Sequence, residues 1–258
     1  MILAIDCGNT NIVIALFEGD TVRGEWRTAT HLDRTADDLG IWLLQVMTLN
    51  GLDRGMVEGC IIASVVPSLD FTLKSMCRRY FNKDPLIVGA EGVEIGVGIK
   101  MDRPEEVGAD RLVDAVAAHA KFGGPLIVID FGTATTFNVI DAEGNFCGGA
   151  LAPGANLSME ALHMAAAKLS RIAIARPPGG RAIGKNTIDA MRSGIYWGYV
   201  SMIEGMVKRI EDEFGAAMTV IATGGLAPLF IEATSRIQHL DTNLTMRGLL
   251  LTYRRNAK

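Results

Sequence analysis

Short apolar runs alternate along the chain with apolar positions at helical spacing, which is typical of an α/β protein. The apolar run 1–5 ends at Asp6 and another follows at 12–17, so the pattern predicts two strands joined by a tight turn. Thr35 and Asp38 have the spacing of a capping box, which marks the start of a helix. The first half is also expected to hold strands at 22–28, 60–66 and 86–88 and a helix over 68–81.

The two halves of the chain resemble each other around two aspartates. Asp6 lies in Ile-Leu-Ala-Ile-Asp-Cys-Gly-Asn-Thr-Asn, and Asp130 lies in Leu-Ile-Val-Ile-Asp-Phe-Gly-Thr-Ala-Thr-Thr. Each segment is an apolar strand, a D-x-G-[NT] turn, a second strand and a Gly-containing turn that leads to a third strand. Because about half of the chain separates the two aspartates, the pattern indicates duplicated units rather than a solenoid of short repeats.

The elements that follow Asp130 support this duplication. We expect strands at 146–151 and 218–222, helices over 156–167 and 187–213, and further helices to the end. Both halves then share three antiparallel strands, a helix, a strand and a helix. The sequence therefore predicts an α/β fold of two ribonuclease H-like domains, 1–116 and 117–258, with mixed sheets flanked by helices and a central cleft. The boundary falls near a helix expected over 111–122.

Composition and charge argue against some classes of binding partner. Of the 258 residues 49% are hydrophobic, which is enough for a sizeable core. The formal net charge is −4 and no run of five Lys or Arg occurs, so we expect no nucleic acid or anionic membrane as partner. No apolar stretch approaches the roughly 20 residues that span a bilayer. The N-terminal segment has the pattern of a strand rather than a signal peptide, so a cytoplasmic protein is expected.

The cysteines and histidines are scattered without the spacing of a zinc site. Each cysteine lies in or beside an apolar run, so buried free thiols are expected. The positions are Cys7, Cys60, Cys77 and Cys147, and His31, His119, His163 and His239.

A D-x-G-x-T turn at the end of a buried strand is suited to binding phosphate. The glycine permits close approach of the backbone, while N–H groups and Asn or Thr side chains donate hydrogen bonds. The carboxylate can hold a cation that neutralises phosphate charge. A single such turn is more often an ordinary Asp-Gly turn. Two of them in equivalent domains favour a phosphate-binding cleft.

Two glycine-rich segments leave alternatives open. Gly224 and Gly225 follow an expected strand and open a helix, so they either admit an adenosine or simply form a tight turn. The segment 179–187 resembles a Walker A loop but has Asn186 where a Mg²⁺-binding hydroxyl is required. It is better interpreted as a loop before a helix that starts near Thr187, whose hydroxyl caps the helix or faces a ligand.

Asp110 precedes a stretch with helical apolar spacing. It is either the N-cap of that helix or, with Arg111 beside it, part of a kinase site. In the second interpretation the carboxylate accepts a proton from the acceptor hydroxyl and the guanidinium orients an anionic substrate.

Taken together, four segments resemble type III pantothenate kinases of the acetate and sugar kinase, heat-shock ATPase and actin superfamily. The resemblance implies an actin-like ATPase fold and homodimers that phosphorylate pantothenate with ATP, with Mg²⁺ and a monovalent cation, K⁺ or NH₄⁺, in the first committed step towards coenzyme A. The segments are Asp6-Cys7-Gly8-Asn9-Thr10-Asn11, Gly108-Ala109-Asp110-Arg111, Asp130-Phe131-Gly132-Thr133-Ala134-Thr135-Thr136 and Thr223-Gly224-Gly225.

The same resemblance implies a role for each matching residue. Asp110 is the general base, and Asp130 holds the monovalent cation. Asp6 lies close to Mg²⁺ through phosphates or water. The residues that the resemblance assigns to ATP are Asp6, Cys7, Gly8, Asn9, Thr10, Asn11, Thr133, Gly224 and Gly225. Those assigned to pantothenate are Met101, Gly108, Ala109, Asp110, Arg111 and Thr187, the last reached from the partner subunit.

One position departs from the family pattern. Many relatives carry Tyr where this chain has Met101, and Met cannot supply a phenolic hydrogen bond. Two other functions remain open: a non-catalytic nucleotide-binding accessory protein of the same fold, and another small-molecule kinase or a phosphatase of the superfamily. The expected helix from Thr187 has a wide apolar face that suits either a subunit interface or the core.

Overall fold

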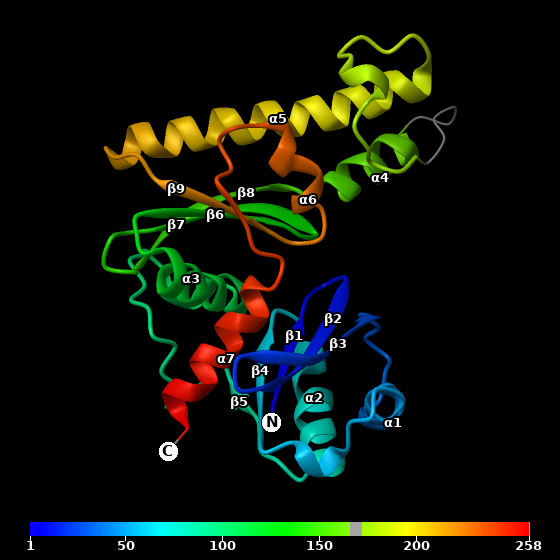
Figure 1. Cartoon of the computed structure of the whole chain (residues 1–258), viewed down its shortest axis with the longest axis vertical. Coiled ribbons are helices and arrows are strands. Elements are labelled where there is room, and N and C mark those ends of the chain that lie inside the picture. The colour runs from blue at the N-terminus through cyan, green and yellow to red at the C-terminus, as the bar shows by residue number, and fades with distance from the viewer. Residues whose placement is uncertain (166–171, 258) are drawn as a thin grey trace. The chain divides into compact units, whose positions relative to one another are not determined.

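A computed structural model describes residues 1–165 and 172–257 of the chain. They form two compact units, the first made of 1–98, 102–120 and 243–257 and the second of 99–101, 121–165 and 172–242. The strands of the first unit are β1 (Ile2–Cys7), β2 (Asn11–Glu18), β3 (Thr21–Ala29), β4 (Gly59–Ser64) and β5 (Leu86–Ile87). Its helices are α1 (Ala36–Leu49), α2 (Pro67–Phe81), most of α3 (Ala109–Phe122) and α7 (Leu244–Asn256) (Figure 1).

The second unit contains the remaining elements. Its strands are β6 (Leu126–Phe131), β7 (Ala134–Ile140), β8 (Phe146–Pro153), β9 (Thr219–Thr223) and β10 (His239–Leu240). Its helices are α4 (Ala155–Ala165), α5 (Thr187–Phe214) and the short α6 (Ala227–Phe230). The predicted end of the α4 helix at residue 167 lies outside the described residues.

The two sheets have the same topology. The first has the order β3-β2-β1-β4-β5, and the second has the order β8-β7-β6-β9-β10. In each, the central strand pairs antiparallel with the next strand along the chain and parallel with the fourth strand of its sheet in chain order. The prediction of two duplicated α/β layers with mixed sheets is therefore confirmed.

The two units are not divided by a single boundary such as the predicted one between residues 116 and 117. The last helix, α7, belongs to the first unit rather than the second, because its apolar side chains pack on the first sheet. Met246, Leu249 and Leu250 are buried against Ala4 and Ala15. Conversely, the segment 99–101 belongs to the second unit, where Ile99 forms a parallel bridge with Phe146.

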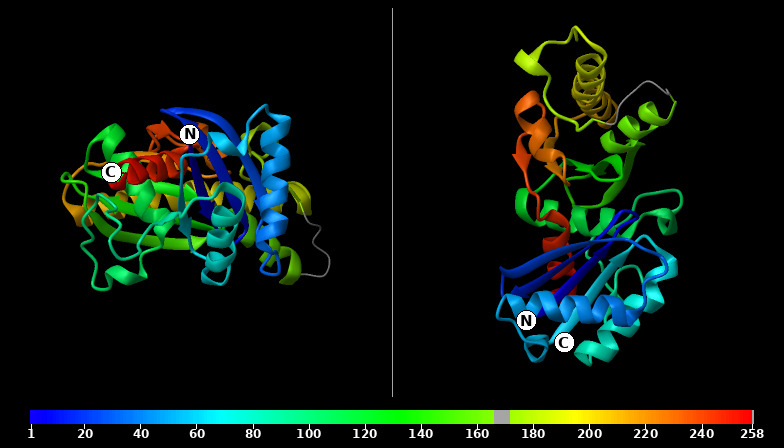
Figure 2. Two further views of the ribbon diagram at one scale, coloured as in Figure 1. Left: turned by 90° about the horizontal axis from the view of Figure 1, so that it is seen from below. Right: turned by 90° about the vertical axis from the view of Figure 1, so that its right-hand side faces the viewer.

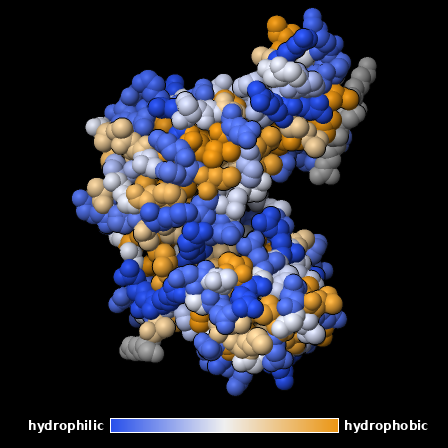
Figure 3. Space-filling view, in the orientation of Figure 1, coloured by the Kyte–Doolittle hydropathy of each residue, from blue (hydrophilic) through white to orange (hydrophobic). Residues whose placement is uncertain are grey.

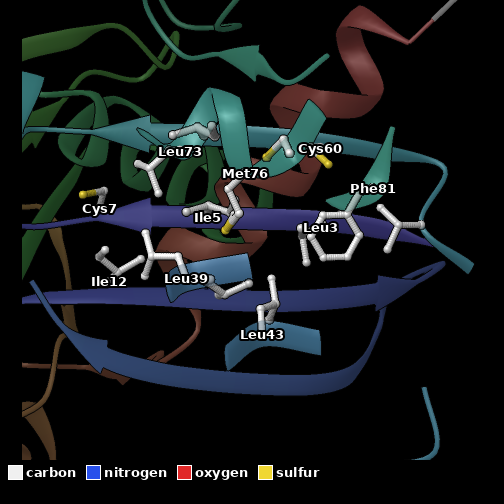
Figure 4. Close-up of a cluster of buried hydrophobic side chains, with 14 of the residues drawn as sticks. Leu3, Ile5, Cys7, Ile12, Leu39, Leu43, Cys60, Leu73, Met76 and Phe81 are labelled. Atoms are coloured by element: carbon white, nitrogen blue, oxygen red, sulfur yellow. The ribbon is translucent and has the colours of Figure 1, made fainter. Parts of the chain in front are cut away.

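Alternation along β1 and β2 divides the side chains of the first sheet between two cores. Leu3, Ile5 and Cys7 point to the face covered by α1 and α2, where Figure 4 shows them packed with Leu43 and Met76. Figure 2 shows these two helices beside the same sheet. Burying each large apolar side chain contributes roughly 1.5–3 kcal/mol. The opposite face is covered by α3 and α7.

Helix starts test two of the local predictions. The capping box at α1 is confirmed, since Asp38 N donates to Thr35 Oγ1 at 3.2 Å and Thr35 N donates to Asp38 Oδ2 at 2.9 Å. At α5 the cap is Asn186, whose side chain accepts from Asp189 N at 2.9 Å, so the prediction that Thr187 caps the helix is wrong. This cap explains why Asn186 stands where a Walker A loop has a hydroxyl residue, because Asn is a favoured N-cap.

Cysteine burial follows the prediction in three of four positions. Cys7, Cys60 and Cys77 are buried free thiols, whereas Cys147 is free but only half-buried because β8 is an edge strand. Of the helices in the described part of the chain, none is long and apolar enough to cross a membrane.

Candidate functional site

The β1–β2 hairpin presents a loop whose polar groups are open to solvent. Gly8 N donates to Asn11 O at 3.0 Å and closes the turn, and Asn9 and Thr10 are exposed at its tip. Thr30, just after β3, fixes the loop from the side. Its N–H donates to Thr10 O at 3.0 Å, and its hydroxyl donates to Gly8 O at 2.6 Å. The loop is thus held at two points, while Asn9 and Thr10 at its tip are exposed where an anion can meet them.

The β6–β7 hairpin forms the corresponding loop in the second unit. Gly132 N donates to Ala134 O at 3.0 Å, and Gly132 and Thr133 are exposed. Gly154, at the end of β8, donates its N–H to Thr133 O at 3.1 Å. A Cβ on Gly154 would lie 2.2 Å from that oxygen, so this backbone contact requires glycine. Thr30 and Gly154 were not predicted; only pairing between distant segments reveals them.

Asp130 lies in a cradle of glycine backbone. It pairs with Thr223 of β9, so its side chain lies beside the β9–α6 turn. A Cβ on Gly224 would lie 2.4 Å from Asp130 Oδ1 and 2.7 Å from Phe131 N, and one on Gly132 would lie 3.2 Å from Oδ2. Gly224 also has a φ of +87°. Gly224 therefore forms the tight turn, and its contact with adenosine stays a prediction.

The donor chemistry of this cradle fits a hard cation. Such ions prefer oxygen ligands, and the half-buried Asp130 carboxylate supplies them among backbone groups that only glycine lets come so close. Among the described residues no cluster of three or more His, Cys, Asp or Glu could enclose a metal ion. Any cation at Asp130 or Asp6 would therefore complete its shell with water, backbone or substrate oxygens, as Mg²⁺ commonly does.

Asp6 is the last residue but one of β1 and lies on the face of the first sheet that α3 and α7 cover. It pairs with Val13 of β2 and with Ala63 of β4. Its neighbour Cys7 points to the opposite face and is fully buried. Burial raises the pKa of the Cys7 thiol to about 11, although a hydrogen bond with Ser64 opposes the shift. Cys7 therefore stays protonated at neutral pH and can offer a ligand only its backbone.

Asp110 lies in the first turn of α3, which begins at Ala109. The N-cap interpretation of Asp110 is therefore wrong. Its Oδ1 accepts from Arg111 N at 2.7 Å, and a Cβ on Gly108 would lie 2.5 Å from the same oxygen. Burial raises the pKa of Asp110, while the backbone N–H and charge of Arg111 oppose the shift. Burial also lowers the pKa of Arg111, with Asp110 opposing.

The remaining predicted residues lie in the second unit. Met101 follows Lys100, whose N–H donates to Phe146 O at 2.8 Å, and its sulfur lies 3.1 Å from the position of a Cβ on Gly148. Thr187 is exposed at the first position of α5. Gly225 follows Gly224 in the β9–α6 turn with open space around its Cα.

Each unit thus contains one part of the site residues predicted from the sequence. The first brings together Asp6, Cys7, Gly8, Asn9, Thr10 and Asn11 at the end of β1, and Gly108, Ala109, Asp110 and Arg111 at the start of α3. The second holds Asp130 and Thr133 with Gly224 and Gly225, and also Met101 and Thr187.

Comparisons with known proteins agree over the whole chain. The sequence profile of a family described as type III pantothenate kinase matches residues 2–209. The chain is 65% identical over 257 residues to the type III pantothenate kinase of Paramagnetospirillum magneticum, covering 100% of this chain and 98% of that protein. It is 64% identical over 256 residues to that of Rhodospirillum rubrum, covering 99% of each.

Solved structures show the same fold at much lower identity. Component A of (R)-2-hydroxyglutaryl-CoA dehydratase from Acidaminococcus fermentans has a TM-score of 0.57 and 15% identity, with 100% of this chain and 99% of that chain covered. At this identity the likeness concerns the fold alone.

Proposed function

The chain belongs to the type III pantothenate kinase family, and on this premise we propose that it transfers the γ-phosphoryl group of ATP to the primary hydroxyl of pantothenate. The product is 4'-phosphopantothenate, and the reaction opens coenzyme A biosynthesis. The relatives from P. magneticum and R. rubrum carry this enzyme name. Cytoplasmic location is part of the proposal.

One structural observation supports the proposal most strongly. Asp6 and Asp130 occupy equivalent positions in two sheets of the same topology, each at the end of the central strand and just before a glycine turn. Two exposed loops that can donate hydrogen bonds to phosphate are what a polyphosphate substrate requires. A third carboxylate, Asp110, supplies the proton acceptor that binding alone would not need.

In the proposed site the nucleotide is held mainly by main-chain groups. The segment Asp6–Asn11 and Thr133 bind the phosphates, and Gly224 and Gly225 take the adenosine end. Gly108, Ala109, Arg111 and Met101 line the pantothenate, and Thr187 reaches it from the partner subunit. Because phosphoryl transfer needs little covalent help from the protein, these contacts act by positioning and by neutralising charge.

Asp110 is proposed to accept the proton of the pantothenate hydroxyl as the γ-phosphorus is attacked. Desolvation raises its pKa, which makes the carboxylate a stronger base than a solvated Asp. The hydrogen bond from Arg111 N holds one carboxylate oxygen, so the other is left to meet the substrate. Arg111 is itself half-buried beside this carboxylate, where its charge can orient an anionic substrate.

Two kinds of cation complete the proposal. Bound Mg²⁺ would supply charge neutralisation on the nucleotide phosphates, with Asp6 holding it through phosphates or water. Asp130 would hold K⁺ or NH₄⁺ with its half-buried carboxylate, since oxygen atoms are the ligands that such ions take. Asp6 contributes an oxygen ligand at a half-buried position, which also fits a hard cation.

We also propose that the protein acts as a homodimer. Most apolar residues of α5 pack into the core, so that helix face alone offers little support. Large apolar side chains nevertheless remain exposed around α4 and the start of α5, and Figure 3 shows apolar surface in this region. They are Leu157, Leu162 and Met164 on α4, Ile183 before α5 and Ile188 on it, at 37–76% exposure.

A coupled assay of ADP release tests the function. The purified chain is supplied with MgATP and pantothenate, with and without K⁺, and in parallel with glucose or N-acetylglucosamine as acceptor. Turnover that requires pantothenate and rises with K⁺ is expected. ATP binding without turnover on any acceptor would indicate an accessory protein, and turnover on a sugar would indicate another kinase.

A further inference from the structure

Neither of the two phosphate-binding loops contains a basic side chain. No Lys or Arg occurs in 6–17 or in 130–141. A nucleotide triphosphate nevertheless carries several negative charges, and enzymes of phosphoryl transfer place cationic side chains as well as metal ions on them. A basic side chain for the phosphates must therefore come from another element.

Strand pairing places Arg27 in one row with Asp6. Asp6 pairs with Val13 across β1 and β2, and Val13 pairs with Arg27 across β2 and β3. Directly paired residues project from the same face of a sheet, so all three side chains leave that face together. Neighbouring strands lie about 4.8 Å apart, which puts the Cα atoms of Asp6 and Arg27 roughly 10 Å from each other. A long arginine side chain can reach across this row.

Helix α7 covers this face of the sheet only up to the row of Asp6, Val13 and Arg27. In the preceding row, Ala4 and Ala15 are fully buried under α7. Asp6 and Val13 are only half-buried, and Arg27 is exposed. A ligand held by the β1–β2 loop can therefore approach the face where Asp6 and Arg27 project.

Arg27 is the arginine of this region without a carboxylate partner. Among the residues that the structure describes, Arg27 makes no ion pair. By contrast, Arg23 on the same strand pairs with Glu18. Arg34 donates to Thr28 Oγ1 at 2.6 Å, and Thr28 belongs to the row of buried Ile12 on the opposite face.

We propose that Arg27 binds the phosphates of the nucleotide held by the β1–β2 hairpin, an inference that rests on the proposed function. Arginine suits this task because its guanidinium stays charged and offers a planar fork of donors to phosphate oxygens. Without a ligand, Arg27 would only protect the edge strand β3 from pairing with another chain, as edge charges often do. The two roles differ in how binding depends on phosphate.

Calorimetric titration of the full-length protein with MgATP, MgADP and adenosine separates these roles. The variants are Arg27→Gln, Arg27→Lys and the control Arg23→Gln, which removes another exposed arginine from the same strand. Arg27→Gln is expected to weaken MgATP binding roughly tenfold or more, since hydrogen bonds to charged groups contribute more than neutral ones. Adenosine affinity should stay within about twofold. Arg27→Lys should recover part of the loss, and Arg23→Gln should bind like the parent protein.

Unchanged MgATP affinity in Arg27→Gln would overturn the proposal and leave edge protection as the role of Arg27. Equal weakening of MgATP and adenosine would also overturn it, because that pattern indicates a distorted sheet rather than a lost phosphate contact. A parent protein that binds ATP but does not phosphorylate pantothenate would refute the proposed function alone. A parent protein that binds no nucleotide would refute both.

Discussion

The β1–β2 and β6–β7 hairpins have the same position in their sheets but are supported differently. The first loop, Gly8–Asn11, is fixed by the hydroxyl and N–H of Thr30, whereas the second, Gly132–Ala134, is pressed against the backbone of Gly154. Asp6 and Asp130 are both half-buried, but glycine backbone, at Gly132 and Gly224, lies against the carboxylate of Asp130 alone among these two. Duplicated topology therefore preserves the place of a carboxylate while its local surroundings differ between the two units.

The largest effects are expected when each carboxylate is neutralised in turn. Asp6→Asn and Asp130→Asn should each reduce kcat by on the order of 100-fold, the cost of removing one electrostatic contact in a site of this kind. Only Asp130→Asn should also abolish the stimulation by K⁺, because that ion is assigned to the glycine cradle. Steady-state rates at varied K⁺ and Mg²⁺ measure both. Equal K⁺ stimulation in the two variants would break the assignment.

The two units also differ in the residue that follows the β-strand partner of each aspartate. Ala63 pairs with Asp6 and is followed by Ser64, while Thr223 pairs with Asp130 and is followed by Gly224. Gly224→Ala should lower the free energy of unfolding by roughly 2–4 kcal/mol, from the positive φ and the clash with Asp130. Ser64→Ala, the matched change, loses a hydrogen bond to Val66 N and should cost about 1 kcal/mol. Urea unfolding compares them, and equal losses would contradict the cradle.

Removing the side-chain support of the first loop should have a smaller effect. Thr30→Val keeps the shape but deletes the hydroxyl that donates to Gly8 O. A loss of about 1 kcal/mol in stability and a rise in KM for ATP are expected, with kcat nearly unchanged. Thr48→Val is the control, because its hydroxyl bonds only a carbonyl of its own exposed helix. A KM unchanged by Thr30→Val would show that the loop needs no such support.

Local patterns sufficed to predict much of this arrangement. The two D-x-G hairpins, the capping box at Thr35 and the start of the helix at residue 187 each depend on residues close in sequence. The match between the two sheets could also be inferred, because the same order of elements recurs after both aspartates.

Contacts between distant segments could not be predicted. The place of α7 on the first sheet depends on its packing with Ala4 and Ala15, which no local pattern encodes. The row of Asp6, Val13 and Arg27 depends on strand register across two hairpins. Asp110 has the residue type of an N-cap, but the helix begins at Ala109, so Asp110 lies inside its first turn with Gly108 against its carboxylate.

The first unit also contains a third carboxylate of the proposed site, Asp110. The pH dependence of kcat/KM should reveal its environment. Because burial raises the pKa of Asp110 above its ordinary 3.8, kcat/KM should fall with decreasing pH at a higher pH than a solvated Asp would give. The same shift makes the protonated form more stable in the folded protein. Its stabilising contribution is present below pH 3.8 and is lost as pH rises through the folded pKa. An acid limb near the ordinary value would contradict this environment.

The most direct test of the account combines turnover with nucleotide binding in Asp110→Asn, with the exposed Asp84→Asn as control. The substitution removes a buried charge without changing shape, so the melting temperature at pH 7 should not fall. We expect pantothenate phosphorylation to collapse while MgATP affinity remains that of the parent protein. Turnover near the parent rate in a folded, ATP-binding Asp110→Asn protein would contradict the assignment of the proton acceptor.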